Sequence, residues 1–160
     1  MRRIAQRLLP AALLIVTACS SIDCPLNNVV YLKMTVDDGS GMMSDTLNVI
    51  AHRPILGDTT MVNSLVEAGS AWVEMSYAQD VDVLILSRHD SLWRTSTDTL
   101  YVEKSNQPHF ESVDCAPTYF HEIKSVSHTH HGLDSAVLYK TTVDYDTTRT
   151  NIKLYFKALD

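Results

Sequence analysis

The sequence has few glycines, prolines, aromatic residues and cysteines for its 160 residues. Five Gly and five Pro exclude a repetitive or low-complexity chain. Aromatic residues make up only 8% of it, too few for the stacking platform of a protein that binds single-stranded nucleic acid, and three cysteines cannot support a disulfide-dense miniature scaffold. With 45% hydrophobic and 20% charged residues, the chain fits one ordinary globular domain.

Basic residues are also scarce relative to acidic ones. Thirteen Lys and Arg against nineteen Asp and Glu give a formal net charge of −6. A chain that binds nucleic acid without regard to sequence needs an excess of positive charge to neutralise phosphates. We therefore expect no nucleic-acid partner.

The first 18 residues have the features of an export signal. Three arginines among residues 1–7 precede an apolar run over 8–16, which is too short to span a bilayer. The segment ends in Val16-Thr17-Ala18-Cys19, which resembles a bacterial lipobox. That resemblance implies cleavage before Cys19 and a lipoprotein whose amino terminus carries three acyl chains, typically palmitate. The alternative is an ordinary secretory signal in which Cys19 carries no lipid.

Cleavage would leave 142 of the 160 residues, with 10 basic and 19 acidic side chains and a net charge of −9. Two or more acyl chains make an essentially permanent membrane anchor. Ser20 follows the cysteine where Asp would signal retention in the inner membrane, so we expect the outer membrane. No run of acids follows Cys19, which favours the periplasmic leaflet, with the cell surface as the alternative.

The two other cysteines form the only remaining pair. In an oxidising compartment Cys24 and Cys115 are expected to form a disulfide that closes a loop of about 90 residues. The alternative is two separately buried thiols. Cys24 follows Cys19 by five residues, which span at most about 18 Å. Residues 19–27 would therefore be a short tether that holds the domain close to the lipid.

The rest of the chain is dominated by alternation of apolar and polar residues, the pattern of half-buried strands. Ala, Val, Ile and Leu recur at every second position, polar turns separate the segments, and only residues 63–68 could form a short helix. Residues 146–149 are expected to connect the last two strands as a hairpin. The expected strands are 30–36, 46–52, 59–66, 71–77, 81–87, 100–104, 136–145 and 151–157. We predict an all-β domain over residues 28–160, an antiparallel immunoglobulin-like β-sandwich of about seven or eight strands.

Several short motifs together resemble a known group of proteins. Besides the lipobox they are Asp-Cys-Pro at 23–25, Asp-Thr-Leu-Tyr-Val at 98–102, Cys115, Leu-Asp-Ser-Ala-Val at 133–137 and Asn-Ile-Lys-Leu-Tyr-Phe at 151–156. In these the chain is similar to small Bacteroidetes outer-membrane lipoproteins that form a domain-of-unknown-function family. The resemblance implies a Gram-negative envelope lipoprotein with a β-sandwich, and it implies no catalytic residue.

Histidines are concentrated in His128-Thr129-His130-His131. On a strand, His128 and His130 would point to the same face about 7 Å apart, which suits two imidazole ligands of zinc, copper or nickel. The alternative is a polar strand end that enters a turn at Gly132. Because no third or fourth ligand is evident, we expect no metal site and keep His128, His130 and His131 only as candidates.

Sequence signatures of common enzymes are absent. The chain has no Gly-x-Ser-x-Gly, His-Glu-x-x-His, Walker or dinucleotide-binding pattern, so we expect no catalytic residue and no cofactor. We predict a non-catalytic interaction module that binds another envelope protein, such as a membrane β-barrel or its assembly apparatus. The alternatives are a binder of metal through His128 and His130, or of carbohydrate through Trp72 and Trp93. A hydrolase with dispersed carboxylates is a third possibility.

Overall fold

The computed structural model describes residues 24, 29–37, 43–66 and 69–159. The lipobox, Cys19 and all of the expected tether except Cys24 lie outside these residues. Within the described residues the chain forms ten strands in two sheets and no helix, so the expected all-β class is confirmed. That part of the chain accordingly has no helix long and apolar enough to cross a membrane. The strands are β1 (Tyr31–Asp37), β2 (Thr46–His52), β3 (Thr59–Leu65), β4 (Ser70–Glu74), β5 (Val81–His89), β6 (Thr95–His109), β7 (Thr118–His128), β8 (Leu133–Leu138), β9 (Thr142–Val143) and β10 (Ile152–Phe156).

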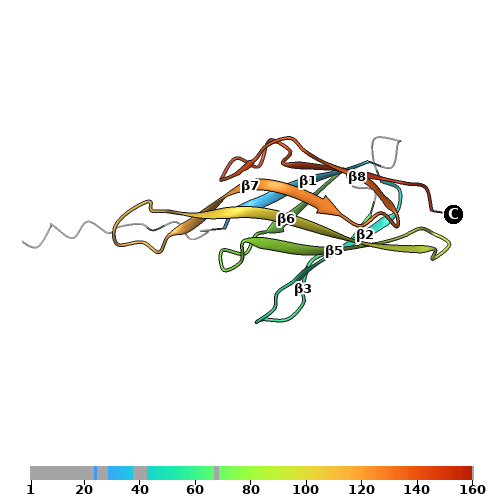
Figure 1. The fold of residues 1–160 in the computed structure, drawn as a ribbon, viewed down its shortest axis with the longest axis horizontal. Coiled ribbons are helices and arrows are strands. Elements are labelled where there is room, and N and C mark those ends of the chain that lie inside the picture. Colours follow the sequence, from blue (N-terminus) through green and yellow to red (C-terminus); the bar gives the residue numbers. More distant parts are fainter. Residues whose placement is uncertain (1–23, 25–28, 38–42, 67–68, 160) are drawn as a thin grey trace, which may run out of the picture.

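The two sheets differ in size and curvature (Figure 1). One has the strand order β4-β1-β10-β8, and the other, β3-β2-β5-β6-β7-β9, curls into a half-barrel. Described neighbours run antiparallel except β1 and β10, which are parallel with Met34 opposite Ile152. The expected count of seven or eight strands and the wholly antiparallel arrangement are therefore wrong. A parallel pair needs a long connection, and β1 and β10 are separated by nearly the whole domain.

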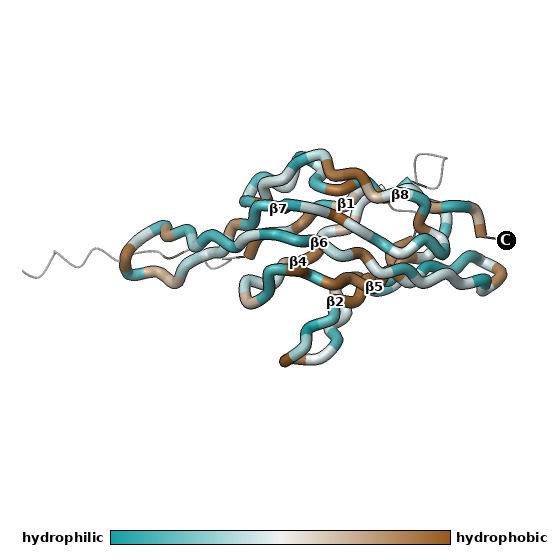
Figure 2. The backbone as a smooth tube through the Cα atoms, in the orientation of Figure 1, coloured by the Kyte–Doolittle hydropathy of each residue, from teal (hydrophilic) through white to brown (hydrophobic). Residues whose placement is uncertain are grey.

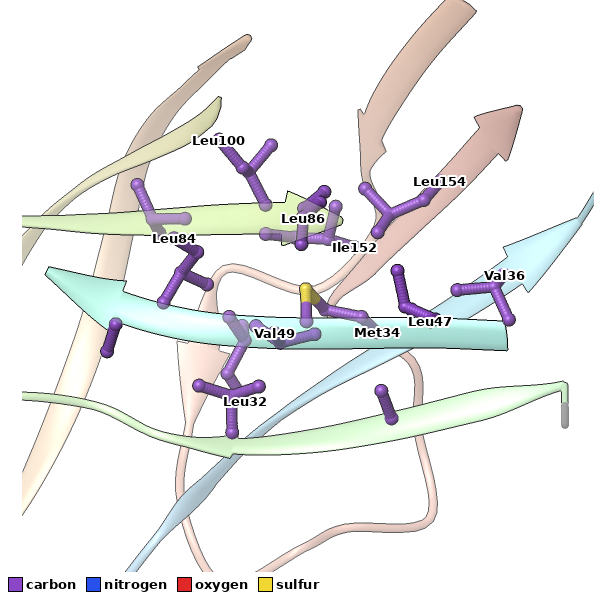
Figure 3. Packing of buried hydrophobic residues seen from close by; sticks show 14 of the residues in the cluster. Leu32, Met34, Val36, Leu47, Val49, Leu84, Leu86, Leu100, Ile152 and Leu154 are labelled. Atoms are coloured by element: carbon purple, nitrogen blue, oxygen red, sulfur yellow. The ribbon is translucent and has the colours of Figure 1, made fainter. Parts of the chain in front are cut away.

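The core lies between the two sheets and explains why the period-two segments form strands. Alternate residues of β1, β2 and β5 point inward and are buried, with polar or half-buried residues between them. Burying each Leu, Val or Ile side chain stabilises the fold by about 1.5 to 3 kcal/mol relative to exposure. Figure 3 shows these side chains packed together from strands of both sheets: Leu32, Met34, Val36, Leu47, Val49, Leu84, Leu86, Leu100, Ile152 and Leu154.

The segment expected as one strand over 136–145 is divided between the two sheets. Its first part belongs to β8, which pairs with β10, whereas β9 pairs with β7. The buried side chain of Asn151 holds the break, because its amide nitrogen donates to the carbonyls of Lys140 (3.2 Å) and Thr142 (2.9 Å). The hairpin expected at residues 146–149 is therefore wrong: that segment crosses from one sheet to the other.

Two further expectations about local structure are corrected. Residues 63–65, where a short helix over 63–68 was possible, belong to β3, in agreement with the strand expected over 59–66, and residues 67–68 lie outside the described residues. In β3 the Ser64 N–H donates to the Asn48 side chain at 2.7 Å. The strand expected over 100–104 extends over 95–109 as β6, and its partner β7 was not expected at all. β7 pairs with β6 along nearly its whole length.

The molecule is elongated, and two different sets of turns lie at its two ends (Figure 1). The β5–β6 pairing ends at Glu103, so the later residues of β6 extend past β5 with β7 alongside. The resulting β6–β7 hairpin projects at one end. The β5–β6 turn and the carboxyl-terminal residues lie at the opposite end. We call these the hairpin end and the far end.

Candidate functional site

The hairpin end contains the disulfide predicted from the sequence. Cys24 and Cys115 are bonded, with 5.5 Å between their Cα atoms, so this prediction is confirmed. Cys115 lies in the turn between β6 and β7, where its N–H donates to the Ser112 carbonyl at 3.2 Å. The bond therefore fixes Cys24, the described residue nearest to the lipobox, to the tip of the projecting hairpin.

Aromatic contacts support the projecting hairpin from two neighbouring segments. The His109 and Phe120 rings stack with centroids 4.4 Å apart, and Phe120 meets Tyr145 edge-on at 5.1 Å. Tyr77, from the loop between β4 and β5, stacks on Tyr119 of β7 at 4.7 Å. These contacts hold the hairpin in a fixed direction relative to the two sheets.

A buried lysine organises the base of the hairpin. Lys104 of β6 donates to the carbonyls of Ser76 and Gln79, both at 2.5 Å, and to the Asn106 side chain at 2.9 Å. Its Nζ is also 3.6 Å from the Asp82 carboxylate. Burial lowers the pKa of Lys104 and raises that of Asp82, and the attraction between them opposes both shifts. Every ammonium proton of Lys104 has an acceptor, so the group holds the β4–β5 loop in place.

His121 is the buried histidine of this cluster. Its Nδ1 is 2.7 Å from the Asn106 side-chain oxygen. Burial, together with the positive charge of Lys104, lowers the pKa of His121 from 6.5 to about 4, so the ring is neutral at pH 7. His121 also lines a surface hollow of about 270 Å³ together with Glu74, Tyr77 and Tyr119. It is remote from the histidine-rich segment beyond the other end of β7.

At the far end, the buried carboxylate of Asp98 holds the β7–β8 connection. Asp98 Oδ1 accepts from the Thr129 hydroxyl (2.8 Å) and the His131 N–H (2.7 Å). Its Oδ2 accepts from the N–H groups of Gly132 (2.7 Å) and Leu133 (2.8 Å). Burial alone would raise the pKa of Asp98, but these four hydrogen bonds outweigh it and hold the pKa below 3.8.

The histidine-rich segment is this same connection. β7 ends at His128, so His130 lies beyond the strand and the expected spacing of about 7 Å along a strand is wrong. The rings of His128 and His130 are 4.3 Å apart between centroids, while His131 points elsewhere, with its Nδ1 3.5 Å from Asp98. Over the described ranges of the chain, no three His, Cys, Asp or Glu side chains are grouped so that they could hold a metal ion.

The β5–β6 turn at the far end exposes two large apolar side chains. Leu92 is 72% exposed and Trp93 is 76% exposed. The turn is held by Asp90, whose carboxylate accepts from the N–H groups of Leu92 (2.8 Å) and Arg94 (3.0 Å) and pairs with the Arg94 guanidinium at 2.6 Å. Trp93 has a positive φ of 62°, and its ring stacks on His89 at 4.8 Å. We call Leu92 and Trp93 the apolar turn.

A buried arginine joins β5 to the carboxyl-terminal strand. Arg88 of β5 donates to the Lys157 carbonyl at 2.6 Å, lies 3.4 Å from Asp45, and places its guanidinium 4.9 Å from the centre of the Phe156 ring. Sequence reasoning singled out Trp93 but missed Leu92, Arg88, Asp98 and Lys104. The partners of the three charged residues are distant in sequence, so no local pattern identifies them.

The second tryptophan considered for carbohydrate binding lies on a different surface. Trp72 of β4 faces outward from the four-stranded sheet and is paired in register with Lys33, whose Nζ lies 5.7 Å from the centre of the Trp72 ring. Trp72 lies in the four-stranded sheet, whereas Trp93 lies in the turn between two strands of the six-stranded sheet. The described structure does not bring them into one carbohydrate site.

A comparison with known proteins places most of the domain in one family. A family model described as a family of unknown function, DUF6452, matches residues 46–156. No curated protein and no solved structure matches the chain.

Proposed function

The chain belongs to this family of unknown function, DUF6452, and from that premise we propose that it is a non-catalytic cell-envelope lipoprotein. Its anchor would be lipid on Cys19 at the outer membrane, facing the periplasm, and its far end would bind another envelope protein. The all-β architecture also supports an immunoglobulin-like sandwich as the finer description of the domain. The observation that carries the proposal is the separation of two features: the disulfide is at the hairpin end, and the apolar turn is at the far end (Figure 1).

The apolar turn has the properties of a protein-binding anchor. Tryptophan is among the residues that most often dominate the binding energy of an interface. Leu92 and Trp93 are both mostly exposed, and Val66 is exposed beside the same hollow that Trp93 lines. Because Asp90 and His89 already fix the turn, little conformational entropy is lost when a partner covers it. Figure 2 shows the hydrophobic tip of the β5–β6 hairpin at the far end.

The proposed partner is a membrane β-barrel or a component of its assembly apparatus. The short spacing between Cys19 and Cys24 supports this choice, because it holds the domain at that membrane. The far end would then meet the part of such a protein that extends from the membrane into the periplasm. The net charge of −9 after cleavage favours a partner with a basic surface around its apolar contact.

The proposal is tested by capture of neighbours from the native envelope after mild cross-linking. We expect one envelope protein to be recovered with the wild-type chain and to be lost, at equal expression, with a Leu92→Asp, Trp93→Ser double variant. The matched control is Ile55→Asp, Leu56→Ser, which removes two exposed apolar residues from the tip of the β2–β3 hairpin. Recovery of the same protein with the far-end variant would contradict the proposal.

A metal-binding function is the second candidate, supported by the adjacent rings of His128 and His130. His128 Nδ1 is hydrogen-bonded to the Thr129 carbonyl at 2.7 Å, which leaves Nε2 of His128 as the ligand atom. Isothermal titration of the mature domain with zinc or copper tests this candidate. Micromolar binding that His128→Gln abolishes would support it, and no heat at micromolar metal would reject it. The hydrolase with dispersed carboxylates is a third proposal, to which we assign no residues.

A further inference from the structure

Two apolar side chains lie at the tip of the β6–β7 hairpin, outside the sandwich. Val113 is 95% exposed and follows Ser112, whose carbonyl accepts from the Cys115 N–H to close the turn. Phe110, which follows the last residue of β6, is 58% exposed. Figure 2 shows this hydrophobic tip at the end of the projection. Neither side chain belongs to the hydrophobic core, so both are available for burial in a membrane or against another molecule.

The same tip is covalently joined to the segment that carries the lipid signal. Cys115 is two residues after Val113 and is bonded to Cys24. Cys24 is five residues after Cys19, and five residues span at most about 18 Å. A lipid on Cys19 would therefore bring the hairpin tip to the membrane surface rather than leave it in the bulk periplasm.

We propose that Phe110 and Val113 insert into the interfacial region of the leaflet that holds the lipid of Cys19, and that this contact sets the direction of the domain. The inference rests on the proposed lipid anchor. The hairpin can set the direction of the whole domain because two other segments hold it. Tyr145, which follows β9, contacts the rings of His109 and Phe120, and Tyr77 of the β4–β5 loop stacks on Tyr119. With the hairpin end on the membrane, the apolar turn points away from the bilayer (Figure 1).

The charges around the tip select the kind of lipid. Glu111 and Asp114 are both exposed beside the two apolar residues, and Glu111 is 3.2 Å from the His109 ring nitrogen. Carboxylates are repelled by an anionic surface and attracted to ammonium groups. The occupant that fits this tip is a leaflet of zwitterionic phospholipid with ammonium headgroups.

The test measures how deeply the tip enters a bilayer. The full chain is exported and purified, and it carries Trp72→Phe and Trp93→Phe so that one added tryptophan reports alone. Val113→Trp places the reporter at the tip. Ile55→Trp is the matched control, because Ile55 is 93% exposed on a different hairpin tip. Both proteins are reconstituted into vesicles of phosphatidylcholine brominated in its acyl chains, and intact mass records the lipid on Cys19.

We expect fluorescence of the Val113→Trp variant to fall to about half or less, as for a side chain buried at the acyl boundary, while the Ile55→Trp variant is little changed. When brominated phosphatidylglycerol is added to the vesicles, quenching of the Val113→Trp variant should weaken. Stronger quenching of that variant would overturn the choice of zwitterionic lipid. If lipid is present on Cys19 and the Val113→Trp variant is unquenched, or both variants are quenched equally, the inference is overturned while the anchor stands. Absence of lipid on Cys19 would overturn the proposed anchor and this inference together.

Discussion

The Asp98 carboxylate on β6 accepts a hydrogen bond of 2.7 Å from the Gly132 N–H, in the connection between β7 and β8. β7 and β8 belong to different sheets, so this contact joins the half-barrel to the four-stranded sheet at the far end. It also explains the histidine-rich segment: the backbone of residues 131–133 wraps one buried carboxylate, and the histidine rings remain at the surface.

The first prediction concerns that carboxylate. Asp98→Asn replaces one oxygen by an amide group that cannot accept the hydrogen bonds made at that position, so buried donors lose their partner. We expect the free energy of unfolding to fall by about 2 to 4 kcal/mol, measured by urea denaturation at pH 7. Asp134→Asn, at an exposed position of β8, is the control and should change it by less than about 0.5 kcal/mol. Equal stability of the two variants would show that the Asp98 network is dispensable.

The second prediction is a pH dependence caused by His121. Its pKa is about 4 in the folded protein, below the usual value of 6.5, so the unfolded chain binds the proton more readily. Stability is therefore fully present above pH 6.5 and is lost as the pH falls toward 4. The loss between pH 7 and pH 4.5 is roughly 2 to 3 kcal/mol from this group.

Urea midpoints at the two pH values, compared with those of His121→Gln, measure the contribution of His121. The comparison is needed because Asp82, whose pKa is raised by burial, and Lys104, whose pKa is lowered by burial, face the same cluster and also affect how stability depends on pH. The variant should lose less stability on acidification than the wild-type protein. Parallel pH profiles for the two proteins would contradict the prediction.

The third prediction concerns the close approach at Gly132. A Cβ at this position would collide with Ser96 Oγ and lie 2.7 Å from Ser96 Cβ, so Gly132→Ala forces the two segments apart. We expect a loss of about 1 to 3 kcal/mol in the free energy of unfolding. Ser96→Gly in the same chain removes the obstructing atoms and should recover most of the loss, since neighbouring substitutions are coupled. Additive losses in the double variant would show that the collision is not the cause.

The fourth prediction concerns the disulfide. Cys24 and Cys115 are 91 residues apart, and a cross-link of that length stabilises a fold by about 4 to 5 kcal/mol by restricting the unfolded chain. The Cys24→Ser, Cys115→Ser variant should unfold at a correspondingly lower urea concentration, and reductant should lower the midpoint of the wild-type protein but not of the variant. A midpoint that neither change affects would contradict this account of the bond.

Most of the strands that sequence analysis found have one clearly apolar face, and β3, which has no buried residue, is the exception. β1, β2, β5 and β10 alternate buried aliphatic side chains with polar ones, so their period is visible without the structure. β7 was missed because two of its inward positions are Thr118 and His121, and because several residues near its end are exposed and polar. The hydrogen bonds that fix Thr118 and His121 are made with other segments of the chain, so the composition of residues 118–128 does not by itself predict a strand.

The same reasoning separates the site residues that were predictable from those that were not. The disulfide followed from the cysteines because one pair remained after Cys19 was assigned to lipid. Arg88, Asp98 and Lys104 are buried charges, and each is stabilised by backbone groups at least 25 residues away in sequence. Trp93 was visible as an aromatic residue near a turn, but its role as part of an exposed apolar turn depends on how Asp90 and His89 hold it.

The most direct measurement of the central claim is photo-cross-linking in intact cells from a reactive amino acid placed at position 93 or at position 113. The claim is that the chain faces the membrane with its hairpin end and a protein partner with its far end. Position 93 should give one discrete adduct with an envelope protein, and position 113 should give lipid adducts and no protein adduct. A protein adduct from position 113, with none from position 93, would contradict the account.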